Sequence, residues 1–350
     1  MVRRIAFAVP GDLATPTGGY AYDRRMIAEL EHLGWQIELV DLGEGFPWPS
    51  SEHRKAALAR LLAVPMGRAI VIDGLALGVI PDAAIQLRAR NPLIALVHHP
   101  LAMESGLTAQ QADSLRTTER AALAAVSGVI VTSAATARQL VSDYNVPADR
   151  ITVARPGNDS VPMSQGSHDG TVHLLSIGAV VRRKGFDVLV AALATLADLP
   201  WRLTIAGDRG RDPKAAAQLD ADIARFELGG KVTILGAVSA EHLAELYAGA
   251  DMFVLASRFE GYGMAYAEAI AHGLPVIGTT AGAIPDTVPA GAGVLVAPDD
   301  ADALALALRR VIENHDERRR LAASARAAAG LLPSWKNSAK IFSRTLEAVI

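Results

Sequence analysis

The sequence predicts an α/β protein of two domains, each built around a doubly wound parallel sheet. The chain has 350 residues, which is more than one hydrophobic core usually organises. Short apolar, β-branched runs alternate along it with longer stretches in which apolar residues recur at helical spacing. The runs show no polar alternation, which is typical of parallel strands covered by helices on both faces. Such sheets bind ligands beyond the carboxyl ends of their strands, so we look for function in the residues that directly follow each run.

The first series of apolar runs predicts six strands in a first domain, residues 1–160. The runs are Ile5–Val9, Ile37–Val40, Ala69–Ile72, Leu93–Val97, Gly128–Thr132 and Ile151–Val153. The N-terminal segment MVRRIAFAVPGD has the charge pattern of a signal peptide, but its apolar run ends at Pro10. The run is too short for a signal sequence, and we interpret it as the first strand.

A second series predicts six more strands in a second domain, residues 161–332. These runs are Val172–Ile177, Arg202–Ala206, Val232–Leu235, Met252–Ala256, Pro275–Gly278 and Val294–Val296. The polar stretch Asn158–Gly170 carries no periodicity and is interpreted as the linker between the domains. Residues 333–350 have apolar side chains at near-helical spacing, so we expect a closing helix that packs back on the first domain. A ligand is then expected in the cleft formed by the carboxyl ends of both sheets.

The composition excludes several classes of function. The formal net charge of −3 argues against broad nucleic-acid binding, which needs a basic surface. It has no cysteine, which removes disulfides, thiol nucleophiles and cysteine-ligated zinc, and which fits a cytoplasmic location. No window approaches the roughly 18 uninterrupted apolar residues of a membrane span. No spacing among the histidines and carboxylates resembles a metal site, so we expect no metal.

A set of basic residues leaves peripheral attachment to a membrane open. These residues are Arg3, Arg4, Arg24, Arg25 and the run His53–Lys55. We favour the interpretation that they form a scattered, solvated face.

The segment SRFEGYGMAYAEAIAHGLPVIGTT, residues 257–280, carries the strongest functional signal. Glu268 lies in the expected helix and shares a face with Met264, Ala267 and Ala271, so its carboxylate is on a largely apolar surface. Burying an unpaired charge costs several kcal/mol, so a donor has to meet it. The hydroxyls of a nucleotide ribose are one such donor. The alternative is a buried helix with a solvated glutamate at its edge.

The loop that begins this helix has the chemistry of an anion site. Glycines 261 and 263 allow the backbone to approach a ligand closely on either side of Tyr262. The first N–H groups of the helix point into the same space and attract an anion such as a diphosphate, with a contribution of roughly 0.3–2 kcal/mol from the helix dipole. Glu260 precedes this loop.

Two groups follow predicted strands of the first domain. Gly18 and Gly19 follow the first strand, where a glycine pair approaches a phosphate or an acceptor but also suits an ordinary loop. His98 leaves the fourth strand first, ahead of His99, and is therefore the histidine we select. His272 ends a helix, and we assign it no functional role.

The segment GAVVRRKG, residues 178–185, follows the first strand of the second domain. Its cations Arg182, Arg183 and Lys184 are either solvated loop charges or partners of a diphosphate held at the facing loop. Arginine supplies a bidentate fork and lysine a point charge.

Taken together, these motifs resemble the retaining glycosyltransferases of family 4, which have the GT-B fold. The likeness covers nearly all of the second domain, through the segments SIGAVVRRKGFDVLVAAL, LTIAGD, VTILGAVSAEHLAELYAGADMFVLASRFEGYGMAYAEAIAHGLPVI, AGAIPDTV and AGVLVAPDD. The paired glutamates with seven residues between them are its most specific feature. The first domain matches more loosely, through the glycine pair, the histidine of VHHP, VIVTSAATARQL and VARPGND.

The resemblance implies transfer of a hexose from a UDP- or GDP-sugar to a hydroxyl acceptor, with retained anomeric configuration and without a metal or other cofactor. The acceptor class stays open between a glycan, a lipid and a small metabolite. The implied roles are Glu268 on the ribose, Glu260 beside the donor sugar, Lys184 on the leaving diphosphate, His98 near the reacting carbon, the backbone of Gly261, Tyr262, Gly263 and Met264 on the sugar and diphosphate, Gly18 and Gly19 beside the diphosphate and acceptor, and the region of Gly236 and Val238 around the base.

One position departs from the family pattern. The family often has an arginine immediately after the glycine at the position of Gly178, and here that residue is Ala179. Arg183, or Arg182 in second place, is expected to supply the missing cation.

Other functions stay open on the sequence alone. A GT-B epimerase or phosphorylase keeps the fold and changes the reaction, and incubation with donor alone would distinguish an epimerase. A catalytically inert sugar-nucleotide-binding protein is the alternative outside the enzymes. A dinucleotide-dependent dehydrogenase is disfavoured, because Gly11–Gly19 lacks the glycine spacing of that fingerprint.

Overall fold

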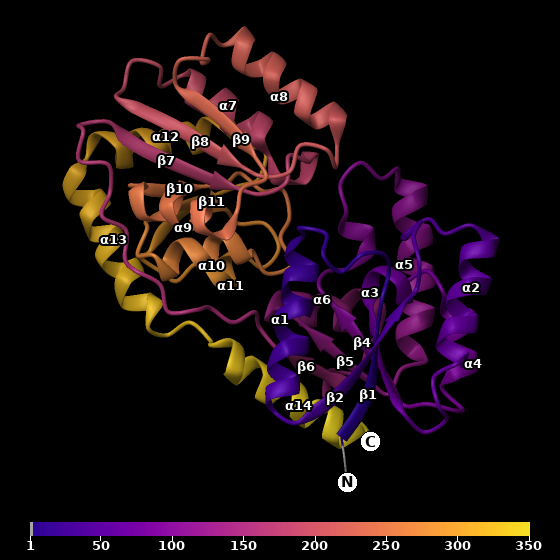
Figure 1. Ribbon diagram of the computed structural model, residues 1–350. Coiled ribbons are helices and arrows are strands. Elements are labelled where there is room, and N and C mark those ends of the chain that lie inside the picture. The colour runs from indigo at the N-terminus through magenta and orange to yellow at the C-terminus, as the bar shows by residue number, and fades with distance from the viewer. Residues whose placement is uncertain (1–2) are drawn as a thin grey trace. The chain divides into compact units, whose positions relative to one another are not determined.

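A computed structural model of the chain describes residues 3–350 and divides them into two compact units (Figure 1). The first unit runs to Gly157 and also contains Pro333–Ile350, and the second is Asn158–Leu332. Each unit has its own sheet of six strands, all parallel. The predicted fold class, two doubly wound parallel sheets, is therefore confirmed.

The first sheet has the strand order β2-β1-β3-β4-β5-β6. Its strands are β1 (Arg3–Val9), β2 (Trp35–Asp41), β3 (Ala69–Asp73), β4 (Leu93–Val97), β5 (Gly128–Val131) and β6 (Ile151–Val153). The helices are α1 (Gly18–His32), α2 (Ser51–Leu62), α3 (Gly74–Leu77), α4 (Pro81–Leu87), α5 (Ala109–Ala124), α6 (Ala134–Tyr144) and α14 (Trp335–Val349), with 3₁₀ turns η1 (Leu101–Met103) and η2 (Ala148–Arg150). Strands β3, β4 and β5 are buried along their whole length, as expected from their uninterrupted apolar sequence.

The second sheet has the order β12-β11-β10-β7-β8-β9. Its strands are β7 (Val172–Ile177), β8 (Trp201–Ala206), β9 (Val232–Gly236), β10 (Met252–Val254), β11 (Val276–Thr279) and β12 (Gly293–Val296). The other elements are η3 (Arg182–Lys184), α7 (Phe186–Ala194), α8 (Pro213–Arg225), α9 (Ala240–Gly249), α10 (Met264–Ala271), α11 (Ile284–Thr287), α12 (Ala301–Glu313) and α13 (His315–Ala329).

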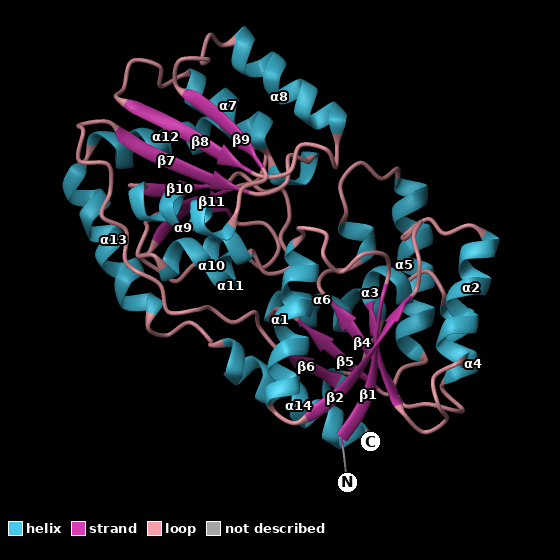
Figure 2. Ribbon diagram, in the orientation of Figure 1, coloured by secondary structure: helices cyan, strands magenta, loops and turns pink. Residues whose placement is uncertain are grey.

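Helices cover both faces of each sheet (Figure 2). In the first unit, α1 and α14 lie on one side of the strands, and α2, α4 and α5 lie on the other. In the second unit, α7, α8 and α12 cover one face and α9, α10 and α11 the other. This three-layer arrangement buries central strands such as β3, β4 and β5 on both faces, which explains why their sequences show no polar alternation.

The strand order places a switch point in each sheet. In the first sheet the chain proceeds outward from β1 in one direction and from β3 in the other. In the second sheet β7 and β10 are the corresponding neighbours, with Leu174 opposite Met252. Loops that leave neighbouring strands in opposite directions open a crevice at the carboxyl ends. The predicted site residues of the second unit lie mainly in the two loops that follow β7 and β10.

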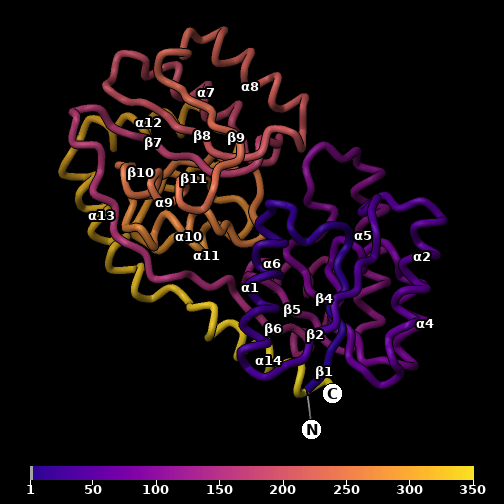
Figure 3. The backbone as a smooth tube through the Cα atoms, viewed as in Figure 1, coloured from indigo at the N-terminus to yellow at the C-terminus, as the bar shows by residue number. Residues whose placement is uncertain are grey.

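The C-terminal helix α14 is part of the first unit, where it packs against α1, β5 and β6. The yellow end of the chain in Figure 3 can be followed into this helix. Trp35 Nε1 donates to Ser343 Oγ at 2.9 Å, and the rings of Trp335 and Tyr22 are 5.9 Å apart. The apolar face that the sequence places on residues 333–350 is therefore used for packing within this unit.

The stretch Asn158–Gly170, interpreted from the sequence as a linker, is without helix or strand but is not a free tether. The Ser164 hydroxyl donates to Ala248 O and Ala250 O, and the Ser164 N–H donates to His272 O. These bonds hold the segment against the second unit. Polar composition gave no sign of them, because their acceptors are backbone carbonyls. No helix within residues 3–350 has the length and apolar character needed to cross a membrane.

Candidate functional site

In the second unit, the loops after β7 and β10 meet in a buried ion pair. The Lys184 ammonium donates to Glu260 Oε1 at 2.7 Å, and Arg183 Nη1 lies 3.4 Å from Glu260 Oε2. The Ser257 hydroxyl donates to the same Oε1 at 2.6 Å. Glu260 is 6% exposed. The sequence placed Lys184 on a diphosphate and Glu260 beside a sugar, but it did not anticipate that these two residues bind each other.

The charges around Glu260 keep it ionised. Burial alone would raise the pKa of this carboxyl, but the positive charges of Lys184 and Arg183 outweigh burial and hold the pKa at about 2. A carboxylate with so low a pKa does not serve as a general acid near neutral pH. Its chemistry here is to fix the two cations at the carboxyl edge of the sheet.

A tight backbone turn positions Lys184. Gly185, at φ 67°, ends the 3₁₀ turn η3 and begins α7. A Cβ at this position would overlap the carbonyl oxygen of Ala256 in the loop after β10. Only glycine combines the left-handed conformation with so close an approach of the two loops. Arg183 Nη1 also donates to Phe259 O at 2.9 Å, which fastens the loops together.

Glu268 is half-buried on α10, and its donor is a residue that the sequence analysis missed. The Tyr247 hydroxyl, from α9, donates to Glu268 Oε2 at 2.9 Å. Tyr247 is 2% exposed and stacks on His272, with ring centroids 4.6 Å apart. Burial raises the pKa of Glu268, while the bond from Tyr247 and the charge of Lys184 oppose that rise. The protein therefore supplies one donor, and Oε1 accepts no hydrogen bond recorded within residues 3–350.

No side chain caps the start of α10. Gly263, at φ 88°, precedes the first residue of the helix, Met264, and has no side chain with which to cap it. The first N–H groups of a helix have no partner within the helix, so they are available to a ligand. Gly261 and Tyr262, which lead into this turn, are buried. The four residues assigned to the sugar and diphosphate thus form the entry to α10.

Three remaining candidates of the second unit lie at the same edge of the sheet. Gly236 ends β9 and accepts a hydrogen bond from the Gly207 N–H at 2.7 Å. Val238, in the following loop, is half-buried. Arg182 is exposed, and its carbonyl accepts from Arg258. Arg183, whose guanidinium contacts Glu260, is thus the arginine close to the ion pair.

In the first unit, Gly19 lies directly against His98. Gly18 is the first residue of α1, which Thr17 caps by accepting from the Tyr20 N–H at 3.1 Å. A Cβ at Gly19 would come within 3.2 Å of His98 Cδ2. His99 is separate from this group and pairs with Glu104 at 3.4 Å.

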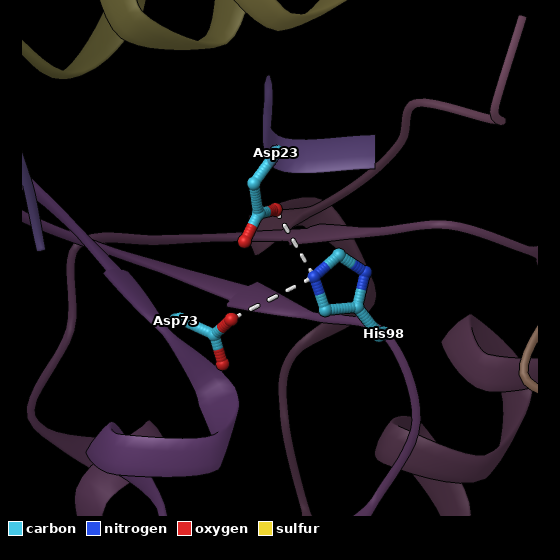
Figure 4. Close-up of side chains that lie close together, drawn as sticks. All are labelled: Asp23, Asp73 and His98. Carbon is cyan, nitrogen blue, oxygen red and sulfur yellow. Dashed lines mark hydrogen bonds and ion pairs between the residues drawn. The ribbon is translucent and has the colours of Figure 1, made fainter. Parts of the chain in front are cut away.

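Two buried aspartates contact His98 through one nitrogen of its ring (Figure 4). His98 Nε2 lies 3.1 Å from Asp23 Oδ1 and 3.8 Å from Asp73 Oδ2. Asp23 and Asp73 are 0% and 2% exposed. The sequence analysis missed both, since they are 75 and 25 positions from His98 and only the sheet topology brings the three together. Asp73 is the last residue of β3 and directly follows the apolar run Ala69–Ile72 named from the sequence, so the rule that selected His98 would also have found it.

The three side chains are also the only cluster of possible metal ligands found within the described residues. Their ligand atoms lie within 4.8 Å of one another. Sequence spacing gave no sign of this cluster, because Asp23 lies in α1, Asp73 at the end of β3 and His98 directly after β4. The expectation that no metal is needed stays a prediction.

Comparisons with known proteins follow the division into two units. The family described as Glycosyltransferase Family 4 matches residues 76–160, and that described as Glycosyl transferases group 1 matches residues 161–328. The two matches run without a gap from one unit into the other. Both descriptions are of glycosyltransferases, and together the two matches cover residues 76–328. The resemblance inferred from the sequence is confirmed.

Curated relatives of this chain include proteins named as glycosyltransferases and mannosyltransferases. It is 35% identical over 170 residues to D-inositol 3-phosphate glycosyltransferase of Pseudarthrobacter chlorophenolicus, covering 45% of this chain and 40% of that protein. It is 28% identical over 316 residues to MMP alpha-(1->4)-mannosyltransferase of Mycolicibacterium hassiacum, covering 84% and 74%. The chain spans about half the length of the first curated relatives it matches, from 40% to 51%.

Solved structures support the GT-B fold. HepE of Anabaena, solved with UDP and glucose, superposes on this chain with a TM-score of 0.79 at 20% identity, over 98% of this chain and all of that one. At this level of identity the similarity shows the fold alone. Both units thus have the Rossmann-like architecture expected from the sequence.

Proposed function

We propose that this chain is a retaining glycosyltransferase that moves a hexose from a UDP- or GDP-sugar to a hydroxyl acceptor without a metal ion. The observation that carries the proposal is the buried Lys184–Glu260 pair at the switch point of the second sheet. It places a fixed ammonium in the same unit as the uncapped start of α10 and the half-buried carboxylate of Glu268. These are the groups that a diphosphate and a ribose require.

The proposed mechanism rests on charge stabilisation. Lys184 and Arg183 assist departure of the nucleoside diphosphate, and the acceptor hydroxyl attacks the anomeric carbon on the face that the diphosphate leaves. The departing phosphate oxygen takes the acceptor proton, so neither glutamate acts as a covalent nucleophile. Preorganised contacts of this kind are each worth several kcal/mol in a transition state. Glu268 Oε1 accepts from the ribose hydroxyls, and His98 lies near the reacting carbon.

Similarity supports the choice of donor and leaves a set of acceptors. HepE of Anabaena was solved with UDP and glucose, and the relative of M. hassiacum is named a mannosyltransferase. We therefore propose a UDP- or GDP-hexose as donor, and a glycan, a lipid or a small metabolite as acceptor. The net charge of −3 gives no support to a nucleic-acid partner. We further propose a cytoplasmic location, with peripheral contact to a membrane in the case of a lipid acceptor.

A thermal-shift screen of UDP- and GDP-sugars tests the donor. A ligand at 100 times its dissociation constant stabilises the native state by about 2.7 kcal/mol, which is readily measured. Stabilisation by one nucleotide sugar, followed by acceptor-dependent release of the diphosphate, is the expected outcome. Conversion of donor without acceptor would indicate an epimerase, and no stabilisation by any member of the set would contradict the proposal.

The variant Lys184→Ala tests the mechanism. Losing a preorganised cation is expected to lower turnover by roughly 10²–10³-fold. Arg182→Ala is the matched control, because Arg182 is an exposed cation of the same turn and is expected to retain most of the activity. Glu268→Ala is expected to weaken donor binding instead. Wild-type kinetics in both Lys184→Ala and Glu268→Ala would refute the assigned roles.

A further inference from the structure

The cluster of Asp23, Asp73 and His98 poses an electrostatic problem that the proposed chemistry does not address. Two carboxylates lie fully inside the first unit, both directed at the same imidazole nitrogen (Figure 4). Two adjacent buried negative charges are strongly unfavourable, so the cluster has to retain protons or take up a cation.

The two carboxylates have different partners. Asp73 Oδ1 accepts from the Leu75 N–H at 2.6 Å and thereby caps α3, which leaves Oδ2 facing His98. Asp23 Oδ1 is the oxygen at hydrogen-bond distance from Nε2, and no donor within residues 3–350 reaches its buried Oδ2. Asp23 therefore binds the histidine directly, whereas Asp73 lies beyond hydrogen-bond distance from the same nitrogen.

The charges favour a cluster that keeps its protons. Burial, and then the neighbouring charge of Asp23, raise the pKa of Asp73 to about 7. Burial lowers the pKa of His98, but the two aspartates outweigh burial and the net direction is upward. The rings of Tyr22 and His98 pack edge to face. The Tyr22 hydroxyl donates to Ala154 O and stays neutral, so Tyr22 adds no charge beside His98.

We propose that Asp23, supported by Asp73, is a positioning residue that keeps His98 protonated at Nε2 and fixes the ring so that Nδ1 is directed to the reacting sugar. A hydrogen bond to one ring nitrogen fixes the orientation and tautomer of a histidine. Nδ1 lies on the side of the ring away from both carboxylates. The side chain of His98 is 19% exposed, so it is still accessible to a ligand. The hydrogen bond between Asp23 and His98 does not depend on the proposed function, whereas its effect on turnover rests on that function.

Gly19 completes this arrangement. Its position against Cδ2 of His98 leaves no room for a side chain unless the ring moves. The imidazole is thus confined by Asp23 at one nitrogen and by the backbone of α1 at its edge.

The first test is spectroscopic and uses the full chain labelled with ¹⁵N-histidine. A long-range ¹H–¹⁵N spectrum is expected to show His98 protonated at Nε2 at pH 7.5, where a free histidine of pKa about 6.5 carries no fixed tautomer. Loss of the signal in His98→Gln assigns it. In Asp23→Asn the Nε2 proton resonance is expected to shift upfield, and His98 to titrate at a lower pH. Wild-type His98 that titrates as a free imidazole would overturn the proposal.

The second test is kinetic, with UDP-glucose and GDP-mannose as donors. Asp23→Asn is expected to lower kcat by roughly tenfold or more and to leave the donor KM within about twofold, because it acts through His98 and not on the nucleotide. Glu31→Gln, which neutralises an exposed carboxylate on the same helix, is the matched control. Equal kcat values in the two variants would overturn the positioning role.

The remaining outcomes are decided separately. If the wild type turns over neither donor, the proposed function fails for these donors, while the spectrum still decides the hydrogen bond. If Asp23→Asn does not fold, the long-range ¹H–¹⁵N spectra of the wild type and of Asp73→Asn still test the proposal. Titration of EDTA-treated protein with Zn²⁺ or Mg²⁺ covers the alternative. Binding of one equivalent, lost in Asp23→Asn and accompanied by loss of the Nε2 proton, would replace the proton account by a metal site.

Discussion

At the scale of single residues, Tyr247 is the donor that makes the half-buried carboxylate of Glu268 tolerable. A hydrogen bond to a charged group contributes about 1.5–3 kcal/mol, so Tyr247→Phe is expected to reduce the free energy of unfolding by that amount at pH 8. At pH 4, where Glu268 with its raised pKa is largely protonated, the loss is expected to be smaller. Urea unfolding at the two pH values measures the difference.

Tyr266→Phe is the matched control for this prediction. The Tyr266 hydroxyl is equally buried but donates to the backbone oxygen of Leu255, which does not titrate. Its loss is therefore expected to cost the same at pH 4 and pH 8. The same pH-independent cost in Tyr247→Phe would contradict the pairing of Tyr247 with an ionised Glu268.

The depressed pKa of Glu260 predicts how stability depends on pH. Its pKa is about 2 in the folded chain and about 4.5 in the unfolded chain, so the contribution is present above pH 4.5 and is lost as pH falls towards 2. The size is about 3 kcal/mol. Urea unfolding between pH 7 and 3 is expected to show a shallower loss in Glu260→Gln than in the wild type. Identical slopes would show that Lys184 and Arg183 do not hold this charge in solution.

At the scale of elements, the turn η3 depends on one glycine. Gly185→Ala forces a Cβ into a left-handed conformation and against the Ala256 carbonyl, so we expect a loss of about 1–3 kcal/mol or more in stability. Because η3 carries Lys184, turnover is expected to fall as well. Gly229→Ala is the control, since nothing lies within 4 Å of a Cβ there and the expected change is within about 0.5 kcal/mol. Equal effects of the two substitutions in urea unfolding would contradict this account.

The elements themselves were largely predictable from sequence, and the contacts between their ends were not. Each apolar run named from the sequence became a strand. The signal is clearest for central strands such as β3, β4 and β5, because burial on both faces leaves a continuous apolar signature. The boundary after β10 was placed two residues late, since Leu255 and Ala256 are apolar but already belong to the loop that leads to Glu260. Hydrophobic patterning identifies the buried face of an element and says nothing about the partner of a polar side chain.

The same limit explains the site. Lys184, Glu260 and Glu268 were found because they directly follow strands or share a family motif. Tyr247 was missed, because a tyrosine on the buried face of α9 gives the same pattern whether or not its hydroxyl has a partner. The aspartates beside His98 were missed because pairing across 25 and 75 positions depends on strand order, which spacing in the sequence does not encode.

At the scale of the whole molecule, the two units are expected to respond separately to mutation. Phe342 on α14 is fully buried in the first unit, so Phe342→Ala is expected to cost about 3–5 kcal/mol there. Hydrogen exchange is expected to increase in α1, β5 and β6 but not in β7 or β8. Ile341→Ala is the matched control, since Ile341 is 39% exposed. Faster exchange throughout both sheets would show that the chain unfolds as one cooperative body.

The return of α14 to the first unit has a consequence for synthesis of the chain. The polypeptide that builds the first sheet is finished at Gly157, but the helix that covers α1 is translated only after the whole of the second unit. At 5–20 residues per second, the ribosome needs roughly 10–40 s to make the intervening chain. When the sequence of the second unit is completed at Leu332, Tyr22 and Trp35 still lack their partners Trp335 and Ser343. The nascent first unit is therefore the stage at which a chaperone would be needed.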